Sequence, residues 1–309
     1  MKLISVVTGC YNEEDNVEKL YLRVKEEMAK LPAYCYEHIF IDNCSSDATP
    51  RILRRLAAAD KNVKVIFNTR NFGHIRSPSH ALRQAKGDAV IGLVCDFQDP
   101  PELIPELLKK WEEGYKIVAA VKKASRENPL MFAVRKFYYR LINYLSEEQQ
   151  IRNFTGFGLY DRRVMDIFRQ MDDPYPYFRG FIAETGFEPA LIEYVQPARQ
   201  GGVTKNNFYT LYDMAMLGIT SHSRLPLRLA GYIGFILSMC SLAVAVIYFV
   251  YKIIFWREFS VGTAPVVIGL FFFSSVQLFF IGIIGEYVGV IHTRVLKRPL
   301  VIEKERINF

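Results

Sequence analysis

The chain has 309 residues, enough for one large domain or two modest ones, and half of its residues are hydrophobic. Its formal net charge is +7, yet no basic cluster is interleaved with aromatic residues, so the charge fits anionic lipid better than nucleic acid. The five cysteines show no paired spacing, which argues against disulfides and against a zinc site.

Short β-branched apolar runs alternate with helix-like segments over residues 1 to about 200. The runs predict strands at residues 3–9, 37–43, 63–68, 89–95 and 116–121. The segments between them predict helices at residues 14–31, 48–59, 77–85 and 101–113. This alternation predicts an α/β domain with a mostly parallel sheet and helices on its faces.

Four polar clusters directly follow predicted strands. They are CYNEED (10–15), DNCSSD (42–47), TRNFGH (69–74) and DFQD (96–99). Ligands of open parallel sheets bind beyond the carboxyl ends of the strands, so the four clusters should meet along one binding edge.

The stretch GLVCDFQDPPE (92–102) has two interpretations. Asp96 and Gln98 offer oxygen ligands for a hard metal ion at the end of a strand. Asp99 either assists them or only caps the helix that the prolines and Glu102 begin.

The C-terminal third points to a membrane. Residues 229–251 and 264–285 contain no charged residue, and each run is long enough to cross the hydrocarbon layer as a helix. Residues 207–228 mix aromatic and basic side chains, as helices in the membrane interface do. The basic residues lie mainly outside the two spans (Arg224, Arg228, Arg294, Lys297 and Arg298), which places both flanks in the cytoplasm.

These motifs carry a resemblance over essentially the whole chain. The chain resembles glycosyltransferase family 2 enzymes with a GT-A fold, and more closely the polyprenyl-phosphate sugar transferases, which include dolichol-phosphate mannose synthase and bactoprenol glucosyltransferases. The matching motifs are YNEE (11–14), IDNCSSDAT (41–49), RNFG (70–73), AKGDAVIGL (85–93), DFQDPPE (96–102), TGFGLYDR (155–162), RQGGVTK (199–205), IIGEYVG (283–289) and KRP (297–299).

The resemblance implies a nucleotide-sugar site and a metal site. The residues that would hold the donor are Tyr11, Asn12, Glu13, Asp42, Arg70 and Asp96. Asp96 and Gln98 would bind Mg²⁺ or Mn²⁺ together with the donor phosphates.

The sequence departs from the family pattern at three positions. Val94 replaces the first acid of Asp-x-Asp-x-Gln, Asn43 replaces the second of a usual acid pair, and Gly156 stands where related enzymes carry an acid. A missing base matters little when the nucleophile is a phosphate monoester, which is already largely dianionic at neutral pH. We therefore expect cationic residues at the acceptor site rather than a carboxylate base.

By resemblance, Arg126, Arg135 and Arg199 bind the acceptor phosphate, with Lys205 beside them. The catalytic set is then Asp96 with these three arginines. The alternative role for each of these basic residues is contact with anionic lipid headgroups instead of the acceptor phosphate. Glu184 is an acid without an assigned role.

The expected function is an inverting transfer of a sugar from a UDP- or GDP-sugar to undecaprenyl phosphate at the cytoplasmic face of the inner membrane. The alternatives are a catalytically silent nucleotide-binding scaffold and, less favoured because no QxxRW pattern is present, a processive polysaccharide synthase. The resemblance also implies that copies can assemble through their spans. The expected domains are a GT-A domain (1–206), juxtamembrane helices (207–228), two spans with an external loop (229–292) and a cytoplasmic tail (293–309).

Overall fold

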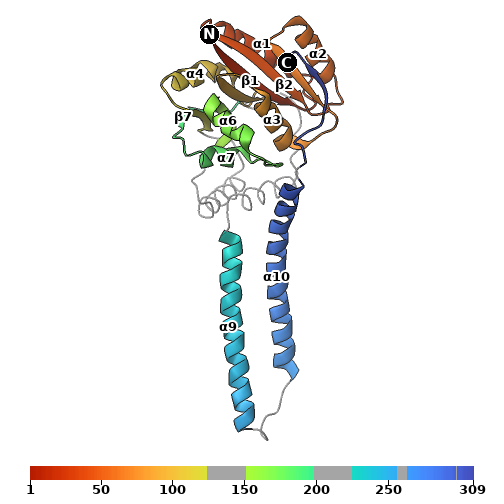
Figure 1. Cartoon of the computed structure of the whole chain (residues 1–309), viewed down its shortest axis with the longest axis vertical. Coiled ribbons are helices and arrows are strands. Elements are labelled where there is room, and N and C mark those ends of the chain that lie inside the picture. The colour runs from red at the N-terminus through yellow and green to blue at the C-terminus, as the bar shows by residue number, and fades with distance from the viewer. Residues whose placement is uncertain (124–150, 198–224, 256–262, 297) are drawn as a thin grey trace.

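A computed structural model describes residues 1–123, 151–197, 225–255, 263–296 and 298–309. Within these residues an α/β domain stands at one end of two long helices (Figure 1). This domain, the catalytic domain of GT-A fold that the resemblance implies, is built on one mostly parallel sheet.

The sheet has eight strands in the order β7-β5-β6-β4-β1-β2-β3-β8. Their bounds are β1 Lys2–Cys10, β2 Tyr34–Asp42, β3 Val63–Asn68, β4 Ala89–Val94, β5 Ile117–Lys122, β6 Phe154–Asp161, β7 Ala190–Tyr194 and β8 Glu303–Ile307. The central strands β4, β1, β2 and β3 pair in parallel, so their carboxyl ends share one edge. β6 runs antiparallel to both β4 and β5.

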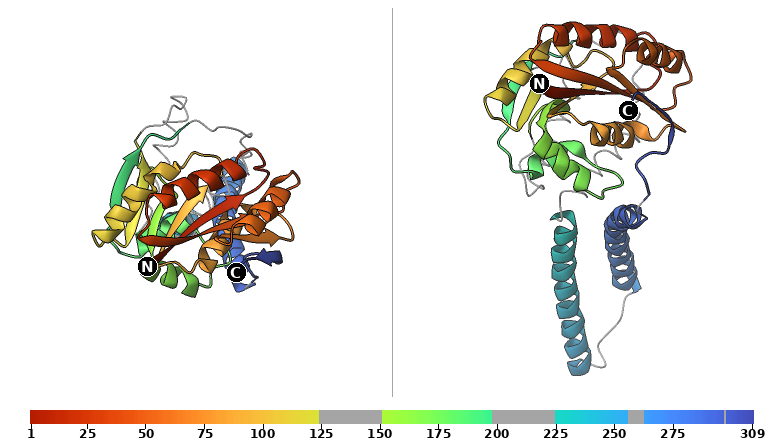
Figure 2. Two further views of the ribbon diagram at one scale, coloured as in Figure 1. Left: turned by 90° about the horizontal axis from the view of Figure 1, so that it is seen from above. Right: turned by 45° about the horizontal axis from the view of Figure 1, so that its top comes forward.

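Helices cover both faces of the sheet, as continuous apolar strands require. α1 (Val17–Ala29), α2 (Thr49–Ala59) and α4 (Ile104–Glu112, after the short helix η1, Pro101–Leu103) share one buried core with the strands. α3 (Gly73–Gln84), α6 (Arg162–Gln170) and α7 (Phe178–Glu184) enclose a second core on the opposite face. Figures 1 and 2 show this second face turned toward the long helices.

The five predicted strands and four predicted helices are confirmed, with differences at their ends. α3 begins at Gly73, four residues before the predicted start, and it accommodates Pro78 inside the helix. The helices α6 and α7 and the strands β7 and β8 were not predicted. α7 has only seven residues, too few to show a helical period.

The residues after the long helices return to the catalytic domain and add β8 to the free edge of β3. Glu303 accepts a 2.6 Å hydrogen bond from His80 of α3, and Arg76 donates a 2.6 Å hydrogen bond to the carbonyl oxygen of Pro299. Thr69, just before Arg70, donates its backbone N–H to the carbonyl oxygen of Ile302. The end of the second long helix is thus tied to the loop and helix that follow β3.

The two long helices are α9 (Leu225–Ile254) and α10 (Thr263–Val295), and they include both predicted spans. In the described residues, one segment is long and apolar enough to cross a membrane: Phe272–Thr293 in α10, of 22 residues. The apolar segment found in α9, Leu229–Ser241, is shorter. The span predicted at residues 229–251, in α9, therefore stays a prediction.

Candidate active site

Strained backbone marks the carboxyl edge of the central strands. Asn12, Cys44 and Phe97 have positive φ angles of 55°, 64° and 61°, and they follow β1, β2 and β4, which are neighbours in the sheet. Such a conformation is unfavourable for a bulky residue such as Phe97 and persists where the surrounding structure enforces it, often at functional sites. The polar clusters after these strands therefore meet at one edge, as the sequence predicts.

A cavity of about 560 Å³ opens at this edge and continues under the sheet. Tyr11 and Glu13 line it from the end of β1, and Asp96 and Asp99 from the end of β4. Its opposite wall comes from α3 and from the start of α7. A cavity of this size suits a small organic ligand.

Asp96 lies in a tight turn at the end of β4. Its side chain is 6% exposed, and its Oδ1 accepts a hydrogen bond of 3.2 Å from the backbone N–H of Gln98. Val94, in place of an acid, exposes 43% of its surface and also lines the cavity. Of the two acids of the family pattern, the chain thus keeps only Asp96, because Val94 occupies the first position.

Asp99 does not cap the following helix, because η1 has Pro100 at its N-cap and no side-chain capping hydrogen bond. Its Oδ2 accepts from the backbone N–H of Val94 (3.3 Å) and its Oδ1 from the Tyr194 hydroxyl (3.2 Å). Burial, with a smaller contribution from the charge of Asp96, raises the pKa of Asp99 to about 7. Asp99 therefore braces the turn that carries Asp96.

The residues after β1 divide into two roles. Asn12 turns away from a ligand role: its Oδ1 accepts from the backbone N–H of Ser46 at 2.8 Å, which joins the loops after β1 and β2. Tyr11 and Glu13 line the cavity, and Glu13 Oε2 accepts from the Asn16 side chain at 2.8 Å.

Asp42 and Arg70 flank the cavity without lining it. Asp42 accepts from the backbone N–H of Ser45 through Oδ2, whereas its buried Oδ1 has no hydrogen-bond partner in the described part of the chain. Burial raises the pKa of this carboxyl group. Arg70 is exposed, and its guanidinium carbon lies 4.1 Å from the centroid of the Phe72 ring.

Asn43 organises the loop that carries Arg70. Its Nδ2 donates to Asn71 Oδ1 (2.8 Å) and to the carbonyl oxygen of Gly73 (3.2 Å). Its Oδ1 accepts from the backbone N–H of Phe72 (2.9 Å) and from Asn68 Nδ2 (3.1 Å). Asn43, which replaces an acid of the family pattern, uses both amide hydrogens and its oxygen in these hydrogen bonds. Its side chain therefore holds the loop after β3 in place.

Sequence reasoning missed two cavity residues, His74 of α3 and Arg179 of α7. His74 ends the polar cluster TRNFGH but received no predicted role, and no motif marks Arg179, because the short helix α7 was not predicted. Glu184 lies at the end of α7 and does not line the cavity. The residues predicted for the acceptor phosphate (Arg126, Arg135, Arg199 and Lys205) lie outside the described residues.

The donor set decides which metal ions the site could hold. The described residues contain no group of three or more His, Cys, Asp or Glu side chains that could bind a metal ion. Cys10 and Cys95, both buried in the cavity wall, are free thiols, and their mutual hydrogen bond and burial keep the pKa of Cys10 above its ordinary value. The oxygens of Asp99 are hydrogen-bonded to Val94 and Tyr194, so the candidate metal ligands in this turn are the oxygens of Asp96 and Gln98.

Comparisons with known proteins agree with this geometry. Residues 5–168 match Glycosyl transferase family 2. An uncharacterised glycosyltransferase of Synechocystis sp. is 35% identical over 298 residues, which cover 96% of this chain and 93% of that protein. The SfII prophage-derived bactoprenol glucosyl transferase of Shigella flexneri is 33% identical over 303 residues, 98% of this chain and 97% of that protein.

Among solved structures, glucosyl-3-phosphoglycerate synthase from Mycobacterium tuberculosis in complex with Mn²⁺, UDP and phosphoglyceric acid is 19% identical, with a TM-score of 0.49. The match covers 71% of this chain and 76% of that one. The family match over more than half of the chain and the relatives that align along nearly all of it lead to one conclusion: this glycosyltransferase belongs to glycosyl transferase family 2.

Proposed function

We propose that the protein transfers a sugar from a nucleotide-diphosphate donor to a polyprenyl phosphate, undecaprenyl phosphate in a bacterium, with inversion at the sugar. The observation that carries this proposal is the cavity that runs from Asp96 under the sheet to α3 and α7, the side of the domain that faces the long helices. Such a cavity brings a polar donor and a lipid-linked acceptor together. The relatives named bactoprenol glucosyl transferase support the same acceptor class.

The donor side fits a nucleoside diphosphate. Asp42 flanks the cavity, and its buried Oδ1, which has no hydrogen-bond partner among the described residues, can accept a hydrogen bond from a base N–H or a ribose hydroxyl. Tyr11 and Glu13 line the neighbouring wall, and the exposed Arg70 can reach the diphosphate or the base. These groups suit UDP and GDP alike.

Asp96, which lines the cavity, and Gln98, which is hydrogen-bonded to it, fit a hard divalent ion, Mg²⁺ or Mn²⁺, because both side chains offer oxygen and the remaining ligands can come from the donor phosphates and water. When bound, such an ion neutralises charge on the departing diphosphate. With one carboxylate at this point, we expect weak metal affinity in the absence of nucleotide. Asp99 stays a supporting residue because its oxygens are occupied by Val94 and Tyr194.

The acceptor needs no base. An oxygen of the lipid phosphate attacks the anomeric carbon, the new carbon–oxygen bond forms, and the bond to the nucleoside diphosphate breaks with its electrons on the leaving oxygen. No proton is transferred, because a phosphate monoester is already largely dianionic at neutral pH. The protein orients the two anions, and this explains how Gly156 can replace an acid.

The membrane arrangement belongs to this proposal. α9 and α10 would both span the inner membrane, with the catalytic domain and the C-terminus in the cytoplasm and the basic flanks toward anionic lipid. Arg126, Arg135, Arg199 and Lys205 would meet the lipid phosphate at the interface. Assembly of several copies through the spans is consistent with the family.

Restoring the missing acid should strengthen metal binding. Val94→Asp places a second carboxylate on an exposed cavity position beside Asp96, so we expect about tenfold tighter Mn²⁺ binding in the presence of UDP or GDP, a difference of about 1.4 kcal/mol. Electron paramagnetic resonance of free Mn²⁺ measures this affinity without turnover. Val94→Asn, of equal size but uncharged, is the matched control, and equal affinity of the two variants would contradict the assignment.

A single-turnover assay tests the function. Purified protein is mixed with labelled UDP- or GDP-sugars and undecaprenyl phosphate, and lipid-linked product is detected by mass spectrometry. We expect a glycosyl phosphate product with one of the donors. Nucleotide binding without product from any common donor would favour the silent scaffold.

A further inference from the structure

A cationic residue lines the cavity on the wall opposite Asp96. Arg179 lies in the first turn of α7, half buried, and His74 faces the same cavity from the start of α3. Arg179 belongs to none of the four polar clusters at the carboxyl edge, and His74 is the last residue of one of them, TRNFGH. Neither residue binds the donor in our proposal.

Within the described part of the chain, no carboxylate neutralises the charge of Arg179. Its guanidinium carbon lies 5.4 Å from the centroid of the Tyr177 ring, and no carboxylate pairs with it among the described residues. Burial, and then the charge of Arg179, lower the pKa of His74. A half-buried arginine without an acidic partner has its full charge available for an anionic ligand.

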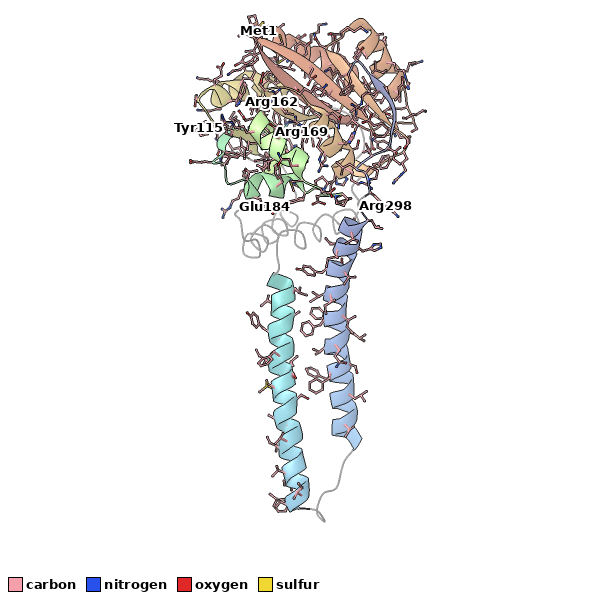
Figure 3. The ribbon with its side chains drawn as sticks, viewed as in Figure 1. Met1, Tyr115, Arg162, Arg169, Glu184 and Arg298 are labelled. Atoms are coloured by element: carbon pink, nitrogen blue, oxygen red, sulfur yellow. The ribbon has the colours of Figure 1, made fainter. Side chains whose placement is uncertain are left out.

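The position of α7 indicates which anion is expected. α7 lies at the side of the catalytic domain nearest the long helices, where Glu184 is labelled at its end, and Arg298 after α10 lies at the same level (Figure 3). The donor diphosphate is expected at the opposite wall, beside Asp96 and Tyr11. An anion that arrives from the membrane therefore reaches Arg179 first.

We propose that Arg179 binds the phosphate group of the lipid acceptor inside the cavity, with His74 as a hydrogen-bonding neighbour. This proposal rests on the proposed function and adds a residue that no motif indicated. The planar guanidinium can donate two parallel hydrogen bonds to a phosphate, which fixes its direction toward the sugar carbon. The face of the Tyr177 ring supports the guanidinium from the other side.

The test compares Arg179→Ala and Arg179→Lys with Arg163→Ala, which removes an exposed arginine from the neighbouring helix α6. Calorimetry in uncharged detergent measures the binding of farnesyl phosphate, farnesol and UDP or GDP to the full chain. We expect farnesyl phosphate to bind about tenfold more weakly to Arg179→Ala and somewhat more weakly to Arg179→Lys, since lysine keeps the charge without the planar fork. Nucleotide and farnesol binding should not change, and Arg163→Ala should behave like the wild type.

In transfer assays, Arg179→Ala should raise the KM for undecaprenyl phosphate about tenfold and leave the donor KM unchanged. Unchanged farnesyl phosphate binding would overturn the proposal, and so would a loss confined to nucleotide binding, which would assign Arg179 to the donor diphosphate. If Arg179→Ala does not fold, Arg179→Lys decides by the same measurements. If the wild type transfers no sugar, the proposed function fails, while farnesyl phosphate binding still decides the role of Arg179.

Discussion

Asp96→Asn is expected to lower the rate of sugar transfer by about 10²- to 10³-fold, the usual cost of removing one group that stabilises charge in the transition state. Asparagine keeps the Oδ1 that accepts from the Gln98 N–H, so the tight turn after β4 should survive. The substitution therefore removes the charge and little else. Labelled sugar transfer to undecaprenyl phosphate measures the loss, and Mn²⁺ binding in the presence of nucleotide should weaken in parallel.

The matched control is Glu106→Gln, which neutralises an exposed carboxylate in the first turn of α4. It should leave transfer and Mn²⁺ binding unchanged. Full activity of Asp96→Asn would remove the metal assignment, because this position would then carry no essential charge. A loss of activity with unchanged Mn²⁺ binding would place the role of Asp96 in contact with the sugar instead.

The central part of the sheet could be predicted because local patterns decide it. The runs that form β1 to β5 are buried on both faces and read as continuous apolar segments, and the polar clusters after them are forced together by parallel pairing. Asp96 was predicted at the binding edge for this reason. The positive φ of Phe97, which shapes the turn beside it, leaves no trace in the sequence.

Other features depend on contacts between distant parts of the chain. β8 is a charged five-residue strand, and it forms because β3 offers a free edge and because Glu303 meets His80. The position of Arg179 in the cavity wall could not be predicted, because it depends on how α7 packs against the rest of the domain. Asn12, predicted to hold the donor, uses its Oδ1 to join the loops after β1 and β2, a contact that no motif indicates. Such pairings are tertiary, and no sequence periodicity encodes them.

Asn43→Asp should destabilise the protein by about 3 kcal/mol, because the replacement changes one atom inside a fully used hydrogen-bond network. Asn43 is 6% exposed, and its Nδ2 faces two acceptors, Asn71 Oδ1 and the carbonyl oxygen of Gly73. An ionised carboxylate would turn an anion toward both oxygens. A protonated one could donate to only one of them.

Either outcome loosens the loop after β3, which bears Arg70 and starts α3, so the KM for the donor should rise together with the loss of stability. The midpoint of thermal unfolding should fall by about 6–12 °C.

Asn71→Asp is the matched control in the same loop. Asn71 Oδ1 only accepts, from Asn43 Nδ2 and from the backbone N–H of Gly73, both at 2.8 Å, and a carboxylate can accept both hydrogen bonds at this exposed position. The same chemical change should therefore cost less than about 0.5 kcal/mol there. Equal stability of the two variants would show that the donors of Asn43 do not hold the loop. The two acceptors around Asn43 Nδ2 would then not explain why this position holds an amide instead of an acid.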